Sequence, residues 1–198
     1  SLHDALPILV GEDTPWQSFE EFVAYAKENP GEVTFGVTLA GVPHLHAAMI
    51  EDATGAEFSY VGYEGTGERI QALVGGHIDA AIGDIASSLE FAKAGDLRML
   101  ATGAAERLEA TPDVPTLQEL GYDLELAITR GLFVPEGTPE KRIDVLANRL
   151  TQLKNDQDFI QQVNDAGAEV VVRGPEAYDA YMDDLDETVS NLADKIRR

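Results

Sequence analysis

Cysteine is absent from the 198 residues of this sequence, so neither disulfide bonds nor thiolate metal sites can form. Long apolar runs are missing as well: none approaches the roughly 18 residues of a membrane-spanning helix, and no signal peptide is recognisable. Basic side chains are few, since 14 Lys and Arg stand against 36 Asp and Glu, which gives a net charge of −22. Such an acidic chain repels nucleic acids and anionic membranes, so we expect neither as a partner.

Familiar catalytic and nucleotide-binding motifs are missing too. The chain has no Gly-x-Ser-x-Gly elbow and no Walker loop, and Gly65-Thr66-Gly67 lacks the third glycine of the dinucleotide motif. His44 and His46 lie two residues apart, so they face different sides of a helix and do not form the HxxxH pair of a zinc site. We therefore predict no catalytic residues, no metal site and no cofactor.

One pair of carboxylates leaves an enzymatic alternative open. Asp79 and Asp84 lie five residues apart around a predicted strand end, and paired carboxylates can perform acid–base chemistry in a small α/β hydrolase or lyase. The competing interpretation gives Asp79 a structural role and makes Asp84 a helix cap, which is a common use of aspartate. We favour this second interpretation.

What the sequence does contain is one well-marked unit, Glu57–Asp84. It is predicted to form a strand, a glycine loop, a helix and a second, parallel strand, in the order Phe58–Val61, Tyr63–Gly67, Glu68–Val74 and His77–Ile82. Ligands of open α/β sheets bind beyond the carboxyl ends of the strands. We therefore expect the glycine loop and Gly83-Asp84 to lie on the same rim of the sheet.

Strands and helices alternate over most of the remaining chain. A helix is predicted over Phe19–Glu28, where Ser18 and Glu21 form a capping box, and strands are predicted over Val33–Val37 and Leu97–Thr102. This alternation predicts an α/β fold with mainly parallel sheets.

The pattern changes between Leu124 and Pro139. An extended buried segment, Leu124–Val134, is followed by almost pure helix. This last part has too few strands to form a sheet by itself, so we expect a domain crossing here and an incomplete second domain. At the other end of the chain, Ser1–Leu6 fits no predicted element.

Two strand-to-helix loops, Thr38–Pro43 and Tyr63–Gly67, carry the best evidence for function. They combine hydroxyl groups, small residues and the backbone N–H groups of helix starts, which suits a carboxylate ligand without a metal. Tyr63 either closes over a ligand or packs in the core. His44 either donates to an anion or is satisfied by a neighbouring group.

Two arginines lie in or near the predicted ligand-binding segments. Arg130 is a lone cation in an apolar segment, so it forms either a ligand clamp or an interdomain salt bridge. Arg69 is assigned to the solvated face of its helix.

Several segments, in this order along the chain, share a resemblance to one family. Ser18–Gly36 is similar to the pattern "sl.elia.Ak.nPG.ltfg", Phe58–Gly67 to "hVPYkGtg" and Arg130–Pro139 to "rGlfaPkGTP". Further matches are Gly75–Asp79, Lys93–Arg98 and Pro112–Gly121. On these segments the chain, from about Pro7 to its C-terminus, resembles the solute-binding proteins of tripartite tricarboxylate transporters, the Bug family.

The resemblance implies a periplasmic binding protein-like fold of type II, with two Rossmann-like lobes that close over a ligand. It implies a periplasmic receptor, not an enzyme, that captures a small carboxylate and delivers it to membrane permease subunits without entering the membrane itself. Family members are longer, so we expect Pro7–Leu126 to be domain two and residues 127–198 the C-terminal part of an incomplete domain one. Ser1–Leu6 is then a candidate non-native leader.

The family's ligand loop corresponds to Thr38–His44, and Asp84 corresponds to a further ligand contact. Gly62 stands where the family usually has proline, and Val42-Pro43-His44 replaces a serine-rich version, which leaves the ligand open among tricarboxylates, dicarboxylates, amino acids and aromatic acids. Because half of the binding site is missing, we expect this chain to bind weakly. A sensory ligand-binding module is a further alternative. The predicted ligand-binding residues are Thr38, Ala40, Gly41, His44, Tyr63, Gly65, Thr66, Asp84 and Arg130.

Overall fold

The structure, a computed structural model, describes residues 2–165 and 168–196, and it divides into two compact units. The large unit consists of Ala5–Ala127 together with Leu192–Arg198, and the small unit of Ser1–Asp4 together with Ile128–Asn191. Within residues 2–165 and 168–196, no helix is both long and apolar enough to cross a membrane.

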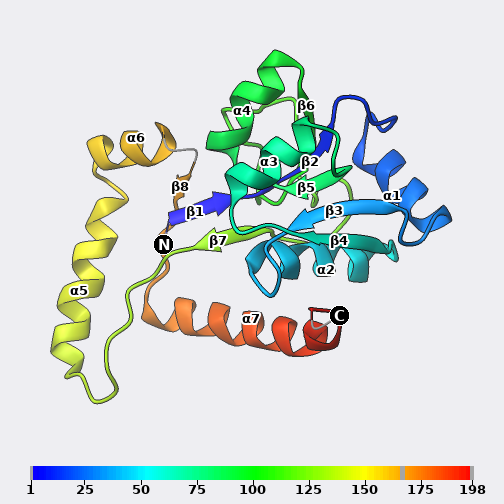
Figure 1. Cartoon of the computed structure of the whole chain (residues 1–198). Helices are drawn as coiled ribbons and strands as arrows, with labels where there is room; N and C mark the ends of the chain where they lie inside the picture. The colour runs from blue at the N-terminus through cyan, green and yellow to red at the C-terminus, as the bar shows by residue number, and fades with distance from the viewer. Residues whose placement is uncertain (1, 166–167, 197–198) are drawn as a thin grey trace. The chain divides into compact units, whose positions relative to one another are not determined.

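The large unit is built on a five-stranded sheet with the order β4-β3-β5-β2-β6 (Figure 1). Strand β3 runs parallel to both β4 and β5, whereas β2 runs antiparallel to β5 and β6. Parallel neighbours need a crossover, usually a helix. The sequence pattern did not predict the reversed direction of β2. The strands are β2 (Pro7–Gly11), β3 (Val33–Val37), β4 (Phe58–Gly62), β5 (Ala80–Ile82) and β6 (Leu97–Thr102).

Helices cover both faces of this sheet. Phe35 and Gly36 are neighbours on β3, so they face opposite sides. The Phe35 ring lies 6.4 Å from Phe22, which belongs to a helix on one side. Gly36 faces the side chain of Arg69, which belongs to a helix on the other side. The helices of the large unit are α1 (Phe19–Glu28), α2 (Val42–Thr54), α3 (Thr66–Val74) and α4 (Ile85–Ala94).

The local sequence signals account for most of these boundaries. Helix α1 begins with the predicted capping box, in which Ser18 Oγ accepts from the Glu21 N–H and Glu21 Oε2 accepts from the Gln17 N–H. Strand β5 is shorter than the predicted His77–Ile82. It begins at Ala80, and Asp79 before it is bonded to Thr34 of β3 through both its backbone N–H and its side chain.

The second sheet has three short strands in the order β7-β1-β8, with β1 antiparallel to β8. Its strands are β1 (Leu2–Ala5), β7 (Ala127–Thr129) and β8 (Glu169–Val170), and its helices are α5 (Glu140–Leu153), α6 (Gln157–Asp165) and α7 (Pro175–Ile196). The expectation that Ser1–Leu6 fits no element is wrong for Leu2–Ala5, because its partner β8 lies far along the chain and leaves no local signal. Ser1 lies outside the described residues.

The predicted buried segment Leu124–Val134 is only partly confirmed. Strand β7 keeps three of its residues, and the segment then leaves the sheet. Leu132 is 65% exposed and Phe133 72% exposed, so the second half of the segment is not buried. The apolar sequence therefore predicted a strand that is longer and more buried than the observed β7.

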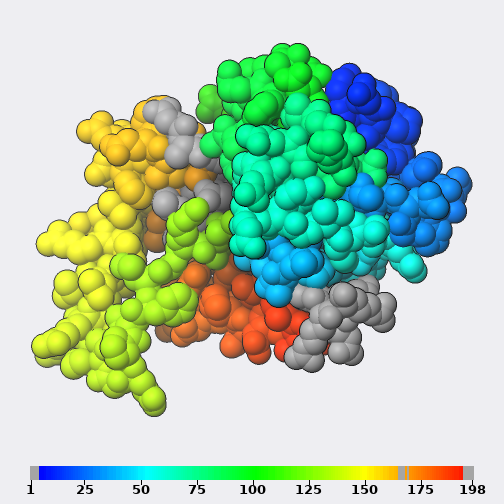
Figure 2. All heavy atoms as spheres, viewed as in Figure 1, coloured from blue at the N-terminus to red at the C-terminus, as the bar shows by residue number. Residues whose placement is uncertain are grey.

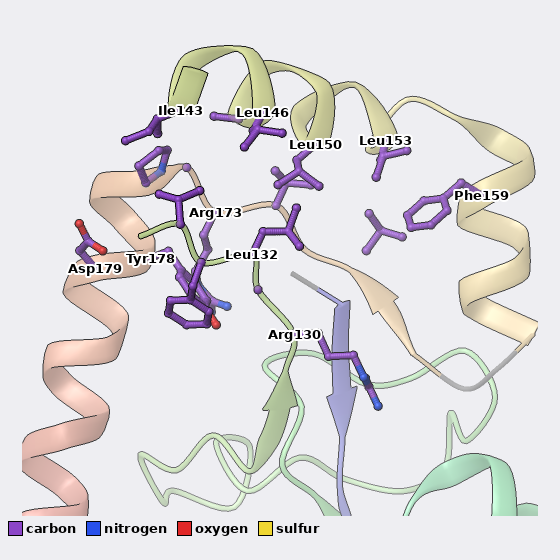
Figure 3. A pocket seen from close by; sticks show the side chains of 18 residues that line it. Arg130, Leu132, Ile143, Leu146, Leu150, Leu153, Phe159, Arg173, Tyr178 and Asp179 are labelled. Atoms are coloured by element: carbon purple, nitrogen blue, oxygen red, sulfur yellow. The ribbon is translucent and has the colours of Figure 1, made fainter. Parts of the chain in front are cut away.

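An open apolar groove of about 510 Å³ lies in the small unit. Figure 3 shows the inward side chains of α5 turned toward Leu132 and Phe159. Helix α5 contains no buried residue although its apolar side chains lie on one face, and Figure 2 shows its spheres, in yellow, with an uncovered surface. The side chains that α5 contributes to the groove are Ile143, Leu146, Ala147, Leu150 and Leu153.

Candidate functional site

The loops that leave β3 and β4 are joined at the carboxyl end of the sheet. The Tyr63 N–H donates to the Val37 carbonyl over 2.8 Å, which fixes the start of the loop after β4 against the end of β3. Both predicted ligand loops therefore lie on one rim, where ligands of α/β sheets bind. The Tyr63 side chain is half-buried and packs against the core, as the second of its two interpretations expects.

The loop after β3 is held in a constrained conformation. The Gly41 N–H donates to the Thr38 carbonyl over 2.9 Å, and the turn between these residues places Ala40 at φ 56°.

 A non-glycine residue in this left-handed region costs about 1–2 kcal/mol. Ala40 is kept there by its own N–H, which donates to His44 Nδ1 over 3.1 Å. Strain of this kind is found preferentially at ligand-binding sites.

His44 stabilises the conformation of this loop through its bond to Ala40. Its side chain is 1% exposed, and its ring lies edge-on to Tyr60 with 4.5 Å between the ring centroids. Because Nδ1 accepts the Ala40 N–H, the ring proton of the neutral imidazole lies on Nε2. Burial lowers the pKa of His44, which favours this neutral form. Within the described part of the chain, the buried Nε2 has no hydrogen-bond partner.

The helix starts on this rim differ in how they are capped. Helix α4 is capped by Asp84, whose Oδ1 accepts from the Ser87 N–H over 2.8 Å. Helix α3 begins after Gly65, which offers no side-chain cap. Its first-turn N–H groups, at Thr66 and Gly67, have no acceptor in residues 2–165 and 168–196. The uncapped start of α3 is therefore an available site for an anion on this rim.

The prediction that Arg69 lies on a solvated helix face is wrong. Its side chain is only 2% exposed and lies at the centre of the rim. Nε donates to the Ile82 carbonyl over 2.8 Å, Nη1 to Thr38 Oγ1 over 3.2 Å and Nη2 to Thr66 Oγ1 over 3.3 Å. One guanidinium thus connects the ends of β3 and β5 with the start of α3.

Two features of the sequence could have located Arg69. Ala72 and Leu73, three and four residues later, are buried, so Arg69 lies on the buried face of α3. Gly36 stands inside a strand, and glycine there marks a close approach: an added Cβ would lie 2.9 Å from Arg69 Cγ. Burial lowers the pKa of Arg69, while the nearby negative charge of Asp84 opposes that shift.

The two carboxylates of the enzymatic alternative are separated. Asp79 precedes β5 and Asp84 follows it, so they lie at opposite ends of the strand. Asp79 Oδ2 accepts from both the Thr34 N–H, over 2.8 Å, and the Thr34 hydroxyl, over 2.5 Å. Asp84 caps α4. Each carboxylate therefore has the structural role that the favoured interpretation gave it.

The Thr34–Asp79 pair gives a testable prediction for stability. Hydrogen bonds to a charged group contribute about 1.5–3 kcal/mol, and we expect a double-mutant cycle of Thr34→Val and Asp79→Asn to yield a coupling energy of about 1–2 kcal/mol in urea unfolding. Asp84→Asn serves as a control, since it keeps the capping oxygen. A coupling energy near zero would show that this contact does not stabilise the sheet.

Arg130 belongs to the small unit, whereas the rim residues belong to the large unit. It follows β7, is exposed, and lines one side of the apolar groove. In Figure 3 its side chain points away from the apolar side chains. Across the residues that the structure describes, no group of three or more His, Asp or Glu side chains could hold a metal ion.

Residues 3–196 match the profile described as TctC, the tripartite tricarboxylate transporter family receptor. This chain belongs to that family. A TctC solute-binding protein from Polaromonas has the same fold, with a TM-score of 0.85, 29% identity, and coverage of 98% of this chain and 67% of that one. The periplasmic binding protein-like α/β fold class is thereby confirmed.

Curated relatives agree with this assignment to the TctC family. The "UPF0065 protein in gbd 5'region" of Cupriavidus necator is 37% identical over 141 residues, which are 70% of this chain and 42% of that protein. BugT of Bordetella pertussis is 29% identical and covers 100% of this chain. This chain spans 61% of BugT, so it corresponds to part of the length of these relatives.

A more distant solved protein shares the fold. MatC from Rhodopseudomonas palustris, solved with bound malate, has a TM-score of 0.73 and 24% identity, and the match covers 98% of this chain and 67% of MatC.

Proposed function

We propose that this chain is part of an extracytoplasmic receptor of the TctC family that binds a small carboxylate at the rim of its large unit. The observation that carries the proposal is the uncapped start of α3, next to the Thr38 and Thr66 hydroxyls and the buried Arg69 guanidinium. On a chain with a net charge of −22 this is a local concentration of donors and positive charge. An anion is the ligand that such a place favours.

The site residues have different parts in this proposal. Thr38, Thr66 and the backbone N–H groups that follow Gly65 contact the carboxylate directly. Ala40 and Gly41 give the β3 exit loop its shape, and His44 holds that loop from behind through Ala40. Tyr63 borders the ligand, and Asp84 places a negative charge near Arg69.

The complete receptor extends the proposal beyond this chain. A second lobe, to which residues 127–198 contribute, closes over the ligand, and Arg130 contacts the ligand from that lobe. The closed receptor then delivers the carboxylate to the membrane permease subunits of a tripartite transporter from the periplasm. Malate, which MatC binds, makes dicarboxylates the first ligands to test.

The experiment is a titration of the isotope-labelled chain with malate, followed by the shifts of its backbone amide signals in NMR spectra. Because one lobe supplies only part of the contacts, we expect a Kd on the order of 1 mM, or roughly −4 kcal/mol. The shifts should be confined to the loops after β3 and β4 and to the start of α3.

Sodium chloride at equal ionic strength is the control, because salt alone screens the charges of so acidic a chain. Shifts that follow ionic strength, or that spread evenly over the large unit, would contradict the proposal. Thr38→Val is the matched variant: it keeps the shape of the side chain and removes the hydroxyl, so it should weaken binding by about tenfold.

A further inference from the structure

Arg69 determines which way two hydroxyl groups can point. A guanidinium carries only donors and accepts no hydrogen bond. Thr38 Oγ1 and Thr66 Oγ1 both accept from it, so neither hydroxyl can direct its own proton at Arg69. Each hydroxyl proton must therefore point to some other acceptor.

No such acceptor is present among the described residues. The hydroxyl groups of Thr38 and Thr66 have no hydrogen bond there except the one from Arg69, and both side chains are half-buried, not sealed in the core. The hydroxyl protons are thus available to solvent or to a ligand at the rim. Donation from a charged group also polarises the hydroxyls, which strengthens them as donors.

We propose that Arg69 is a positioning residue that fixes Thr38 and Thr66 as hydrogen-bond donors toward the ligand. This inference rests on the proposed function and narrows its ligand: the bound group must accept at both oxygens, as an ionised carboxylate does. An amide of the same shape brings its own donor against a fixed donor and is rejected. A site that pairs with one polar pattern discriminates strongly against the wrong one.

The test compares malate with its neutral diamide, malamide, in the same NMR titration. We expect the wild-type chain to prefer malate by at least about tenfold. In Arg69→Met the hydroxyls can rotate, so malate affinity should fall by about tenfold and the preference over malamide should shrink to about threefold or less. Arg69→Lys keeps the positive charge but lacks the two fixed N–H groups that donate to Thr38 and Thr66. It should therefore recover the preference for malate over malamide only in part.

Three results would overturn the inference. The first is a folded Arg69→Met variant that keeps the wild-type preference for malate. The second is full recovery by Arg69→Lys, which would mean that charge alone is sufficient. The third is an unchanged preference in the double variant Thr38→Val and Thr66→Val, which retains Arg69 and decides the question if Arg69→Met fails to fold. All three results require that the wild-type chain binds malate. A wild-type chain that binds no malate overturns the proposed function instead, so the two failures are distinguishable.

Discussion

Gly103→Ala is expected to lower the free energy of unfolding by about 3 kcal/mol, at the upper end of the usual cost of overpacking. Gly103 follows β6 and takes part in a closed set of backbone bonds: its N–H donates to the Leu6 carbonyl, its carbonyl accepts from the Leu126 N–H, and the Leu6 N–H donates to the Leu126 carbonyl. A Cβ on Gly103 would lie 2.5 Å from both N and O of Leu126. Because these are backbone atoms, the segments themselves would have to move apart.

Urea unfolding followed by circular dichroism measures this effect, and Gly67→Ala is the matched control. Gly67 lies in the first turn of α3, has no atom within 4 Å of an added Cβ, and has no positive φ. Alanine there should raise the free energy of unfolding by up to about 1 kcal/mol, because the unfolded chain loses freedom. If both alanine variants were as stable as the wild-type chain, close packing at Gly103 would be disproved.

Acidification should destabilise the fold through His46. Its side chain, in α2, is 4% exposed, and burial lowers its pKa from 6.5 to about 4. The folded state therefore favours neutral His46, and the unfolded state takes up the proton first. The stabilisation is fully present above the unfolded pKa of 6.5 and is lost as the pH falls toward 4. At 1.36 kcal/mol for each pKa unit, this amounts to about 3 kcal/mol.

Comparison with His46→Leu isolates this contribution. Many carboxylates also titrate in the acid range, so the useful quantity is the difference between the wild-type chain and the variant, measured by urea unfolding at about pH 7.5 and about pH 4.5. Leucine should remove about 2–3 kcal/mol of the pH dependence. The exposed His77, changed to glutamine, should leave it intact. A pH dependence that is the same in His46→Leu and the wild-type chain would contradict the prediction.

Local sequence signals located most of the helices and strands of the large unit. Capping at Ser18 and Asp84 was predicted correctly, because an N-cap depends only on residues three positions apart. The direction of β2 was not predictable in the same way, because it depends on which distant strands become its neighbours. The same limit concealed β1, whose partner β8 leaves no mark on the residues around Leu2.

At the candidate site, the loops were predictable and the central side chain was not. Glycines, threonines and helix starts mark Thr38–Pro43 and Tyr63–Gly67 in the sequence alone. Arg69 was misassigned because charged residues on helices are usually solvated. Its burial is compensated by three acceptors from three different segments, an arrangement that only the folded chain brings together.

The pairing of β1 with β8 has a consequence for the order of folding. Every strand of the large unit's sheet is complete once Thr102 has been synthesised, whereas Leu2 must wait for Val170. Closing so long a loop costs more entropy than closing the shorter loops within the large unit, and non-local pairings form slowly. During synthesis the large unit's sheet can therefore assemble while β1 still lacks β8. Strand β1 is synthesised before every strand of the large unit's sheet, yet it is among the last to find all its partners.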